Sequence, residues 1–287
     1  MTQAEAGFTL SAFGDEIHDD MDVQLELLNE LDIGYLELRK AWGTNVLQLD
    51  DAQVAAVKAA CGRHSIRVSC IGSPVGKTSI SEPLDATLRD LDRIFQIAEA
   101  LDTGAIRLFS FYPPDEDGDG QQDRYLGEAV SRLSAMAGAA EKRDMLLLLE
   151  NENGLVGDIP ERCRAILKGV DSPSLRFVWD TGNFPSTGVV QATERGWPLL
   201  SEYLVWVQVK DTRMSDGAIT VAGDGDGQVP ELLARLRDSG YRGFLALEPH
   251  LKVAGRRGGF SGPEGMRRAA AALRGLMADA GCREVGG

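Results

Sequence analysis

The chain has 287 residues, of which 43% are hydrophobic and 26% charged, so a soluble globular protein with a substantial core is expected. Thirty basic and forty-four acidic residues give a net charge of −14, which disfavours duplex nucleic acid and anionic membranes as partners. No apolar run approaches the roughly 20 residues that span a bilayer, the four cysteines form no CxxC pair, and residues 1–7 lack a basic-then-apolar leader. We therefore expect a cytoplasmic protein that acts on a small molecule.

Short apolar segments alternate along the chain with longer segments whose apolar residues lie three and four positions apart. The first kind predicts buried strands over 8–13, 35–38, 66–71, 105–109, 145–149, 175–179, 204–209 and 243–247. The second kind predicts amphipathic helices between them, ending with an alanine-rich helix over 263–279. This alternation is typical of a parallel sheet covered by helices.

Eight strand–helix units in this length favour an α/β fold of one (β/α)8 TIM barrel. An open doubly wound sheet is the alternative, but residues 11–16 contain one glycine and no dinucleotide-binding fingerprint. We expect one domain over residues 1–280 and a flexible tail over 281–287. The long connections at 72–83, 110–123, 211–229 and 248–262 predict a covered substrate pocket at the carboxyl ends of the strands.

Carboxylates terminate three of the last four predicted strands. Glu150, Asp180 and Glu248 each follow a buried apolar run, and Gln208 ends the remaining strand. A carboxylate in such a place is costly unless it is paired, hydrogen-bonded or bound to a metal. Each one alone is explained by a helix cap or a loop hydrogen bond. Together, at neighbouring strand ends, they predict a site for a divalent cation, which is the simplest compensation for their charge.

The expected metal ligands are Glu150, Asp180, Gln208 and Glu248. All four offer oxygen, and neither imidazole nor thiolate is in the set. Such ligands favour Mn²⁺ or Mg²⁺ over zinc.

The same strand ends carry motifs that resemble a known family. Glu-Asn at 150–151, Asp-Thr-Gly-Asn at 180–183, Val-Lys-Asp at 209–211 and Leu-Glu-Pro at 247–249 resemble the xylose isomerase-like TIM-barrel superfamily. Within it the chain looks like the sugar phosphate isomerase/epimerase group, over nearly its whole length. Two positions depart from the pattern, because Gln208 and Asn183 stand where relatives commonly have histidine. Gln208 would still offer its amide oxygen as a neutral, weaker ligand.

The resemblance implies a metal-dependent isomerase or epimerase that acts on a sugar or sugar derivative by proton transfer next to a carbonyl, via an enediolate. In family members the proton transfers fall on the glutamates after strands 5 and 8, here Glu150 and Glu248. A lyase of the inosose dehydratase type and a catalytically weakened sugar-binding barrel are the alternatives. A DNA-repair endonuclease of the same superfamily fits poorly with three histidines and a net charge of −14. Homo-oligomers are usual among similar proteins.

Other polar residues near strand ends are candidates for binding the substrate. Glu152 and His250 lie two residues beyond predicted ligands, so an extended backbone would point them to the same side. Lys210 is also expected to pair with the carboxylates and position them. The predicted substrate-binding residues are Glu37, Lys77, Glu152, Asn183, Lys210 and His250.

Overall fold

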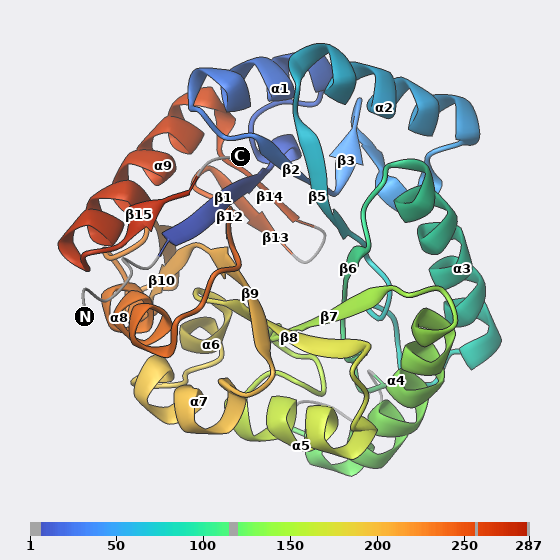
Figure 1. Cartoon of the computed structure of the whole chain (residues 1–287). Helices are drawn as coiled ribbons and strands as arrows, with labels where there is room; N and C mark the ends of the chain where they lie inside the picture. The colour runs from blue at the N-terminus through green and yellow to red at the C-terminus, as the bar shows by residue number, and fades with distance from the viewer. Residues whose placement is uncertain (1–6, 115–119, 256–257, 286–287) are drawn as a thin grey trace.

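A computed structural model describes residues 7–114, 120–255 and 258–285, and within them eight parallel strands close into a barrel (Figure 1). The strands lie in the order β12, β9, β8, β7, β6, β5, β2 and β1, and β12 pairs with β1 to close the ring. Their bounds are β1 Gly7–Phe13, β2 Tyr35–Leu38, β5 Arg67–Gly72, β6 Ala105–Leu108, β7 Leu146–Glu150, β8 Leu175–Asp180, β9 Leu204–Val209 and β12 Phe244–Leu247. The predicted TIM barrel is confirmed.

Helices form a ring outside the strands in Figure 1. They are α1 Met21–Glu30, α2 Asp51–His64, α3 Leu84–Ala100, α4 Leu126–Glu141, α5 Pro160–Val170, α7 Ala192–Leu200, α8 Val229–Ser239 and α9 Gly262–Asp279. In α3 the apolar positions Leu91, Ile94, Phe95 and Ala98 are all buried, as their spacing predicts. Among the described residues, none of the helices is both long and apolar enough to cross a membrane.

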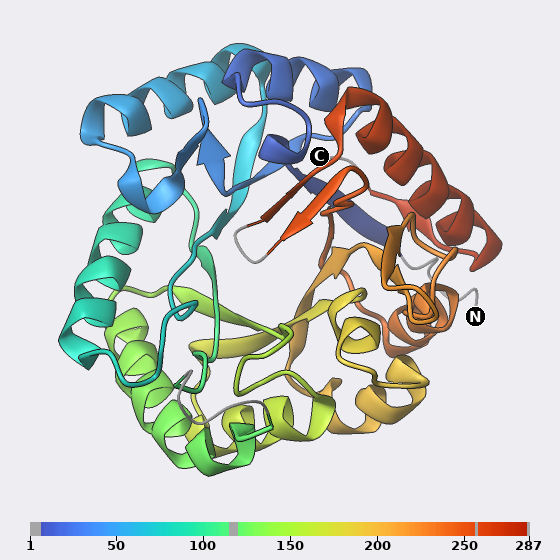
Figure 2. The ribbon, with the colours of Figure 1, turned by 180° about the vertical axis from the view of Figure 1, so that it is seen from behind.

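Short elements follow the carboxyl ends of the strands and build one face of the barrel. One of them, the hairpin of β13 and β14, lies over the interior of the ring in both Figure 1 and Figure 2. The elements are η1 Gly14–Glu16, β3 Lys40–Ala41, β4 Thr44–Asn45, η2 Val46–Gln48, η4 Gln122–Tyr125, α6 Asn183–Ser186, β10 Asp211–Arg213, β11 Ala218–Thr220, β13 Val253–Gly255 and β14 Gly258–Phe260. The long connections expected after strands 7 and 8 thus contain hairpins of their own.

The strands place the acidic residues on the inside of the barrel. A small apolar cluster contains Leu148, Val178 and Trp206, one from each of β7, β8 and β9. Because side chains alternate along a strand, the residues two positions later share the same face. Those residues are Glu150, Asp180 and Gln208, so the polar site lies directly above this apolar layer.

The end of the chain differs from the expected flexible tail. Arg283–Glu284 form β15, which pairs in parallel with the start of β1, and the backbone N–H of Val285 donates to Phe8 O at 3.0 Å. Backbone hydrogen bonds to the start of β1 therefore hold these residues against the sheet. Residues 286 and 287 lie outside the described part of the chain.

Candidate active site

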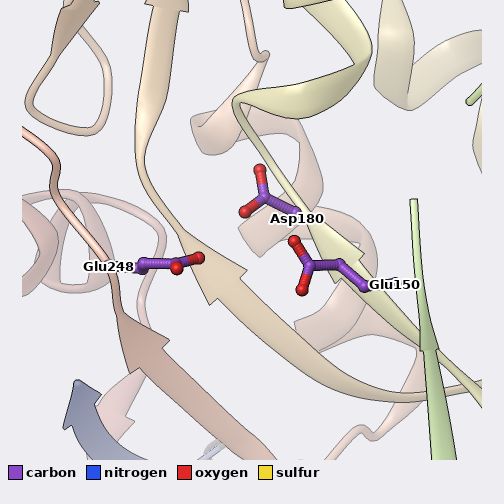
Figure 3. A group of neighbouring side chains, drawn as sticks. All are labelled: Glu150, Asp180 and Glu248. Carbon is purple, nitrogen blue, oxygen red and sulfur yellow. The ribbon is translucent and has the colours of Figure 1, made fainter. Parts of the chain in front are cut away.

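Three carboxylates meet at the carboxyl end of the barrel. Glu150 and Asp180 are the last residues of β7 and β8, and Glu248 directly follows β12. All three are buried, and one oxygen of each lies within 4.8 Å of the others. Figure 3 shows their carboxylates pointing toward one shared space from different strands. The convergence expected from the strand ends is present.

Hydrogen bonds from neighbouring loops fix this arrangement. Asp180 Oδ1 accepts the backbone N–H groups of Gly182 at 2.9 Å and of Asn183 at 2.8 Å, at the start of α6. Asn183 Nδ2 in turn donates to Glu150 Oε1 at 3.0 Å. The Asn151 side chain accepts from the backbone N–H of Asp180 and donates to its carbonyl oxygen, at 2.9 and 3.0 Å. The Asn residues of both motifs thus tie β7 to β8 and orient the carboxylates.

Basic side chains supply part of the charge compensation. Arg107 Nη1 lies 3.1 Å from Glu150 Oε2, Lys210 Nζ lies 2.8 Å from Asp180 Oδ2, and Arg39 Nη1 lies 2.5 Å from Glu248 Oε1. The sequence predicts a metal ion as the compensating charge, and neither arginine is among the predicted site residues. Lys210 pairs with the carboxylates as expected of it.

The four predicted ligands nevertheless suit a hard cation. Glu150 Oε2, Asp180 Oδ2, Gln208 Oε1 and Glu248 Oε2 are all buried. The three carboxylate oxygens face Arg107 or Lys210, at 3.1, 2.8 and 3.6 Å, whereas Gln208 Oε1 accepts no hydrogen bond within the described residues. For Gln208 the reason is visible, because its Nε2 donates to Glu37 Oε1 at 2.7 Å and the amide oxygen is left over. A buried set made only of carboxylate and amide oxygens is the kind of ligand set that Mg²⁺ and Mn²⁺ prefer.

The pKa values of the three carboxylates differ because the protein's own cations compensate their charges unequally. Burial raises the pKa of Glu150 to about 8, against the opposing charge of Arg107 and with the repulsion of Glu248 and Asp180. Burial also raises the pKa of Asp180 to about 6, although Lys210 opposes the shift. For Glu248 burial is outweighed by Lys210, His250 and Arg39, which hold its pKa well below the usual range. Part of the cluster is thus under-compensated by the protein's own cations, which a bound cation would relieve.

A cavity of about 1050 Å³ opens beside the carboxylates. It is lined by five of the six predicted substrate-binding residues, namely Lys77, Glu152, Asn183, Lys210 and His250. Lys77 Nζ and Glu152 Oε2 form an ion pair at 2.6 Å. Glu37 is different, because it is fully buried, accepts from Gln208 and Trp206, and is not among the residues that line the cavity. Glu37 is connected to the site by the hydrogen bond that it accepts from Gln208.

His250 reaches the cavity by an unexpected route. Its φ is +49°, so the backbone there is left-handed and not extended. Glu16 holds it in place, because Glu16 Oε1 lies 2.7 Å from His250 Nδ1 and Oε2 accepts the backbone N–H of His250 at 3.0 Å. The other ring nitrogen, Nε2, lies 3.6 Å from Glu248 Oε1. Burial by itself would raise the pKa of Glu16. The hydrogen bond from His250 and the charges of His250 and Arg39 outweigh this effect and lower the pKa to about 2.

Three residues of the site escaped the sequence reasoning: Glu16, Arg39 and Arg107. Arg39 Nη2 also pairs with Glu16 Oε1 at 2.9 Å, and its Nε pairs with Asp15 Oδ2 at 2.8 Å. A signal for Arg107 exists, since it is the one charged residue in the apolar strand 105–108. For Glu16 the signal is its position soon after the end of the first strand, because a carboxylate at the end of a strand is the feature that predicts the other three.

Comparison of the chain with known proteins identifies its family. A family model described as xylose isomerase-like TIM barrel matches residues 25–276. A curated but uncharacterized protein of Methanocaldococcus jannaschii is 26% identical over 126 residues, which cover 43% of each chain.

Solved structures share the fold over most of their length. A D-tagatose 3-epimerase-like protein has a TM-score of 0.72 at 17% identity, with 95% of this chain and 97% of that one covered. A probable 3-DHS dehydratase from Bacillus anthracis has a TM-score of 0.68 at 16% identity, covering 93% and 98%. A barrel protein from Mycobacterium smegmatis in complex with magnesium has a TM-score of 0.66 at 15% identity, covering 95% and 98%. These likenesses establish the fold. The match to the family model over residues 25–276 shows that the chain belongs to the xylose isomerase-like TIM barrel family.

Proposed function

We propose that this protein is a divalent-metal-dependent isomerase or epimerase that acts on a sugar or sugar derivative by proton transfer next to a carbonyl. The observation that carries the proposal is the convergence of Glu150, Asp180 and Glu248 within 4.8 Å at the mouth of the barrel. The active sites of TIM-barrel enzymes lie at this end of the strands. The similarity to an epimerase-like protein and to a magnesium-bound barrel supports the assignment.

Glu150, Asp180 and Glu248 would hold the metal, with Gln208 Oε1 as a neutral fourth ligand. When bound, Mg²⁺ or Mn²⁺ supplies Lewis-acid chemistry, stabilising negative charge that develops on substrate oxygens. Glu37 keeps the Gln208 amide nitrogen occupied, so that its oxygen remains available. The site suits a small carbohydrate, since the adjoining cavity of about 1050 Å³ is lined by charged and amide groups that bind hydroxyl and carbonyl oxygens.

The two glutamates approach the shared space from opposite sides. Glu150 ends β7 and Glu248 directly follows β12, with β8 and β9 between these strands in the sheet. Arg39 holds Glu248 Oε1 and Asn183 holds Glu150 Oε1, which fixes the orientation of both carboxylates. We infer that one glutamate removes the proton from the carbon beside the carbonyl and that the other returns a proton to the opposite face, which inverts that carbon. Transfer on one face between neighbouring carbons would instead interconvert aldose and ketose.

Hydrogen exchange in D2O tests this function directly. With added Mn²⁺ or Mg²⁺ and a panel of ketoses and cyclic polyol ketones, NMR should show deuterium entering the carbon beside the carbonyl. Glu150→Gln and Glu248→Gln should each abolish the conversion of one epimer into the other, because inversion needs a proton-transferring carboxylate on both faces and an amide accepts no proton at neutral pH. Asp158→Asn is the matched control, since Asp158 is a buried carboxylate paired with Arg162 outside the cavity.

The other outcomes separate the competing functions. A product that has lost the mass of one water would identify a lyase. Sugar binding without exchange, under any added metal, would identify a binding barrel and refute the proposed catalysis.

A further inference from the structure

The cavity at the mouth of the barrel has more basic than acidic residues in its lining, whereas the chain as a whole is acidic. Acidic residues outnumber basic ones by forty-four to thirty over the whole sequence. Among the residues lining the cavity, five are basic and three are acidic, namely Arg39, Lys40, Lys77, Arg107 and Lys210 against Glu150, Glu152 and Glu248. Asp180, Asp15 and Glu16 are not in the lining but pair with Lys210, Lys40 and Arg39, so the excess of basic residues belongs to the surface of the cavity and not to the site as a whole.

The positive charge is also grouped on one side. Arg39 and Lys40 follow β2, Lys77 follows β5, and Arg107 lies in β6. These three strands are neighbours in the sheet, whereas the carboxylate cluster lies at the carboxyl ends of β7, β8 and β12. We call Arg39, Lys40, Lys77 and Arg107 the basic half of the mouth. The remaining cation, Lys210, belongs with the carboxylates through Asp180.

Charge compensation explains only part of the basic half. Arg39 and Arg107 are nearly inaccessible and hold Glu248 and Glu150. Lys40 is different, since its side chain is 30% exposed and its ion pair with Asp15 is long, with 3.8 Å between Nζ and Oδ2. Lys77 is 17% exposed and pairs with Glu152 at the cavity wall. Both lysines line the cavity, and both form ion pairs with residues outside the cluster of three carboxylates, namely Asp15 and Glu152.

We propose that the substrate carries an anionic group, a carboxylate or a phosphate monoester, which binds at the basic half against Lys40 and Lys77. Its carbonyl end would then lie at Glu150, Asp180 and Glu248. That second part rests on the proposed function, whereas anion binding at the basic half does not. The overall charge of −14 would repel such a substrate, so an attractive local field at the entrance is what its capture requires.

Equilibrium binding to matched probes tests the proposal. D-fructose, D-fructose 6-phosphate and D-fructuronate share a ketose end and differ at the sixth carbon, which carries no charge, a phosphate or a carboxylate. Isothermal titration calorimetry of the full chain with added Mg²⁺ should give at least tenfold lower Kd values for one or both anionic probes than for fructose. Which anionic probe binds more tightly distinguishes phosphate from carboxylate.

Charge-removing variants then locate the anion. Lys40→Gln and Lys77→Gln should each reduce the preference for the anionic probe several-fold. Lys58→Gln is the matched control and should not, because Lys58 pairs with Asp102 on the outer surface and does not line the cavity. Circular dichroism confirms folding, and the partly exposed Lys40 keeps the test informative if Lys77→Gln is destabilised.

Equal affinity for neutral and anionic probes, no binding of either anionic probe, or a preference that survives both lysine variants would overturn the proposal. The proposed catalysis fails separately. Tight, lysine-dependent binding of an anion with no hydrogen exchange would support the anion site and refute the isomerase. Hydrogen exchange on neutral ketoses with no preference for anionic probes would support the isomerase and refute the anion site.

Discussion

Arg39 offers the sharpest test of how the site is stabilised. Its guanidinium reaches Asp15, Glu16 and Glu248 at 2.8, 2.9 and 2.5 Å, and its side chain is only 3% exposed. Arg39→Met keeps most of the volume but leaves three buried carboxylates without this partner. Breaking a buried ion pair costs about 3–5 kcal/mol, because a charge is left uncompensated in a poorly polarisable interior.

Urea denaturation in EDTA measures that cost without contributions from a bound metal. With a slope of about 3 kcal/mol/M, the midpoint should fall by roughly 1–1.7 M. Arg63→Met is the matched control, since its ion pair with Asp22 at 2.6 Å is on the surface and its side chain is 58% exposed. That variant should leave the midpoint nearly unchanged, because water screens an exposed pair.

The pH dependence checks the cause of the loss. In the native protein the pKa of Glu16 is lowered to about 2, so its stabilising contribution is present above the unfolded value of about 4.5 and is lost as the pH falls through 2. Without Arg39 the pKa of Glu16 in the folded state should rise, so protonation relieves the repulsion at a higher pH. The difference in stability between native protein and variant should therefore shrink between pH 7 and pH 5. A small loss, or one that does not change with pH, would refute this account.

Three further predictions address the metal, the thiols and the backbone. Added Mg²⁺ or Mn²⁺ should raise the Tm of the protein, and Asp180→Asn should remove that rise while Asp158→Asn retains it; an unchanged Tm with both ions would count against the metal site. Burial raises the pKa of the thiols of Cys61, Cys70, Cys163 and Cys282, to about 11 for Cys61. A thiol reagent at pH 8 should therefore react slowly with them until the protein is unfolded, and rapid labelling of the folded protein would contradict this prediction. Gly76→Ala should lower the Tm far more than Gly217→Ala, because both glycines have positive φ but only at Gly76 would a Cβ lie 2.1 Å from the backbone oxygen of Phe109; equal shifts would show that strain alone matters.

The sequence carries the fold and the acidic part of the site in local patterns. Alternation of apolar strands with amphipathic segments predicts the barrel, and the carboxylates after Leu149, Trp179 and Leu247 predict where acidic groups gather. This works because parallel strands bring their carboxyl ends to one face, so position along a strand already specifies position in the site. The expectation that Glu248 and His250 point to the same side assumes an extended backbone, and His250 instead has a left-handed one.

The pairing of these groups was decided only by the closed barrel. Arg39 and Glu248 are 209 positions apart, and Glu16 and His250 are 234 apart, yet both pairs are in contact. No local pattern links such residues, since their proximity depends on β12 pairing with β1. The sequence by itself determined which strand ends bear charge. Ring closure determined which charges meet, because it joins the first and last strands and converts the two ends of the chain into neighbours.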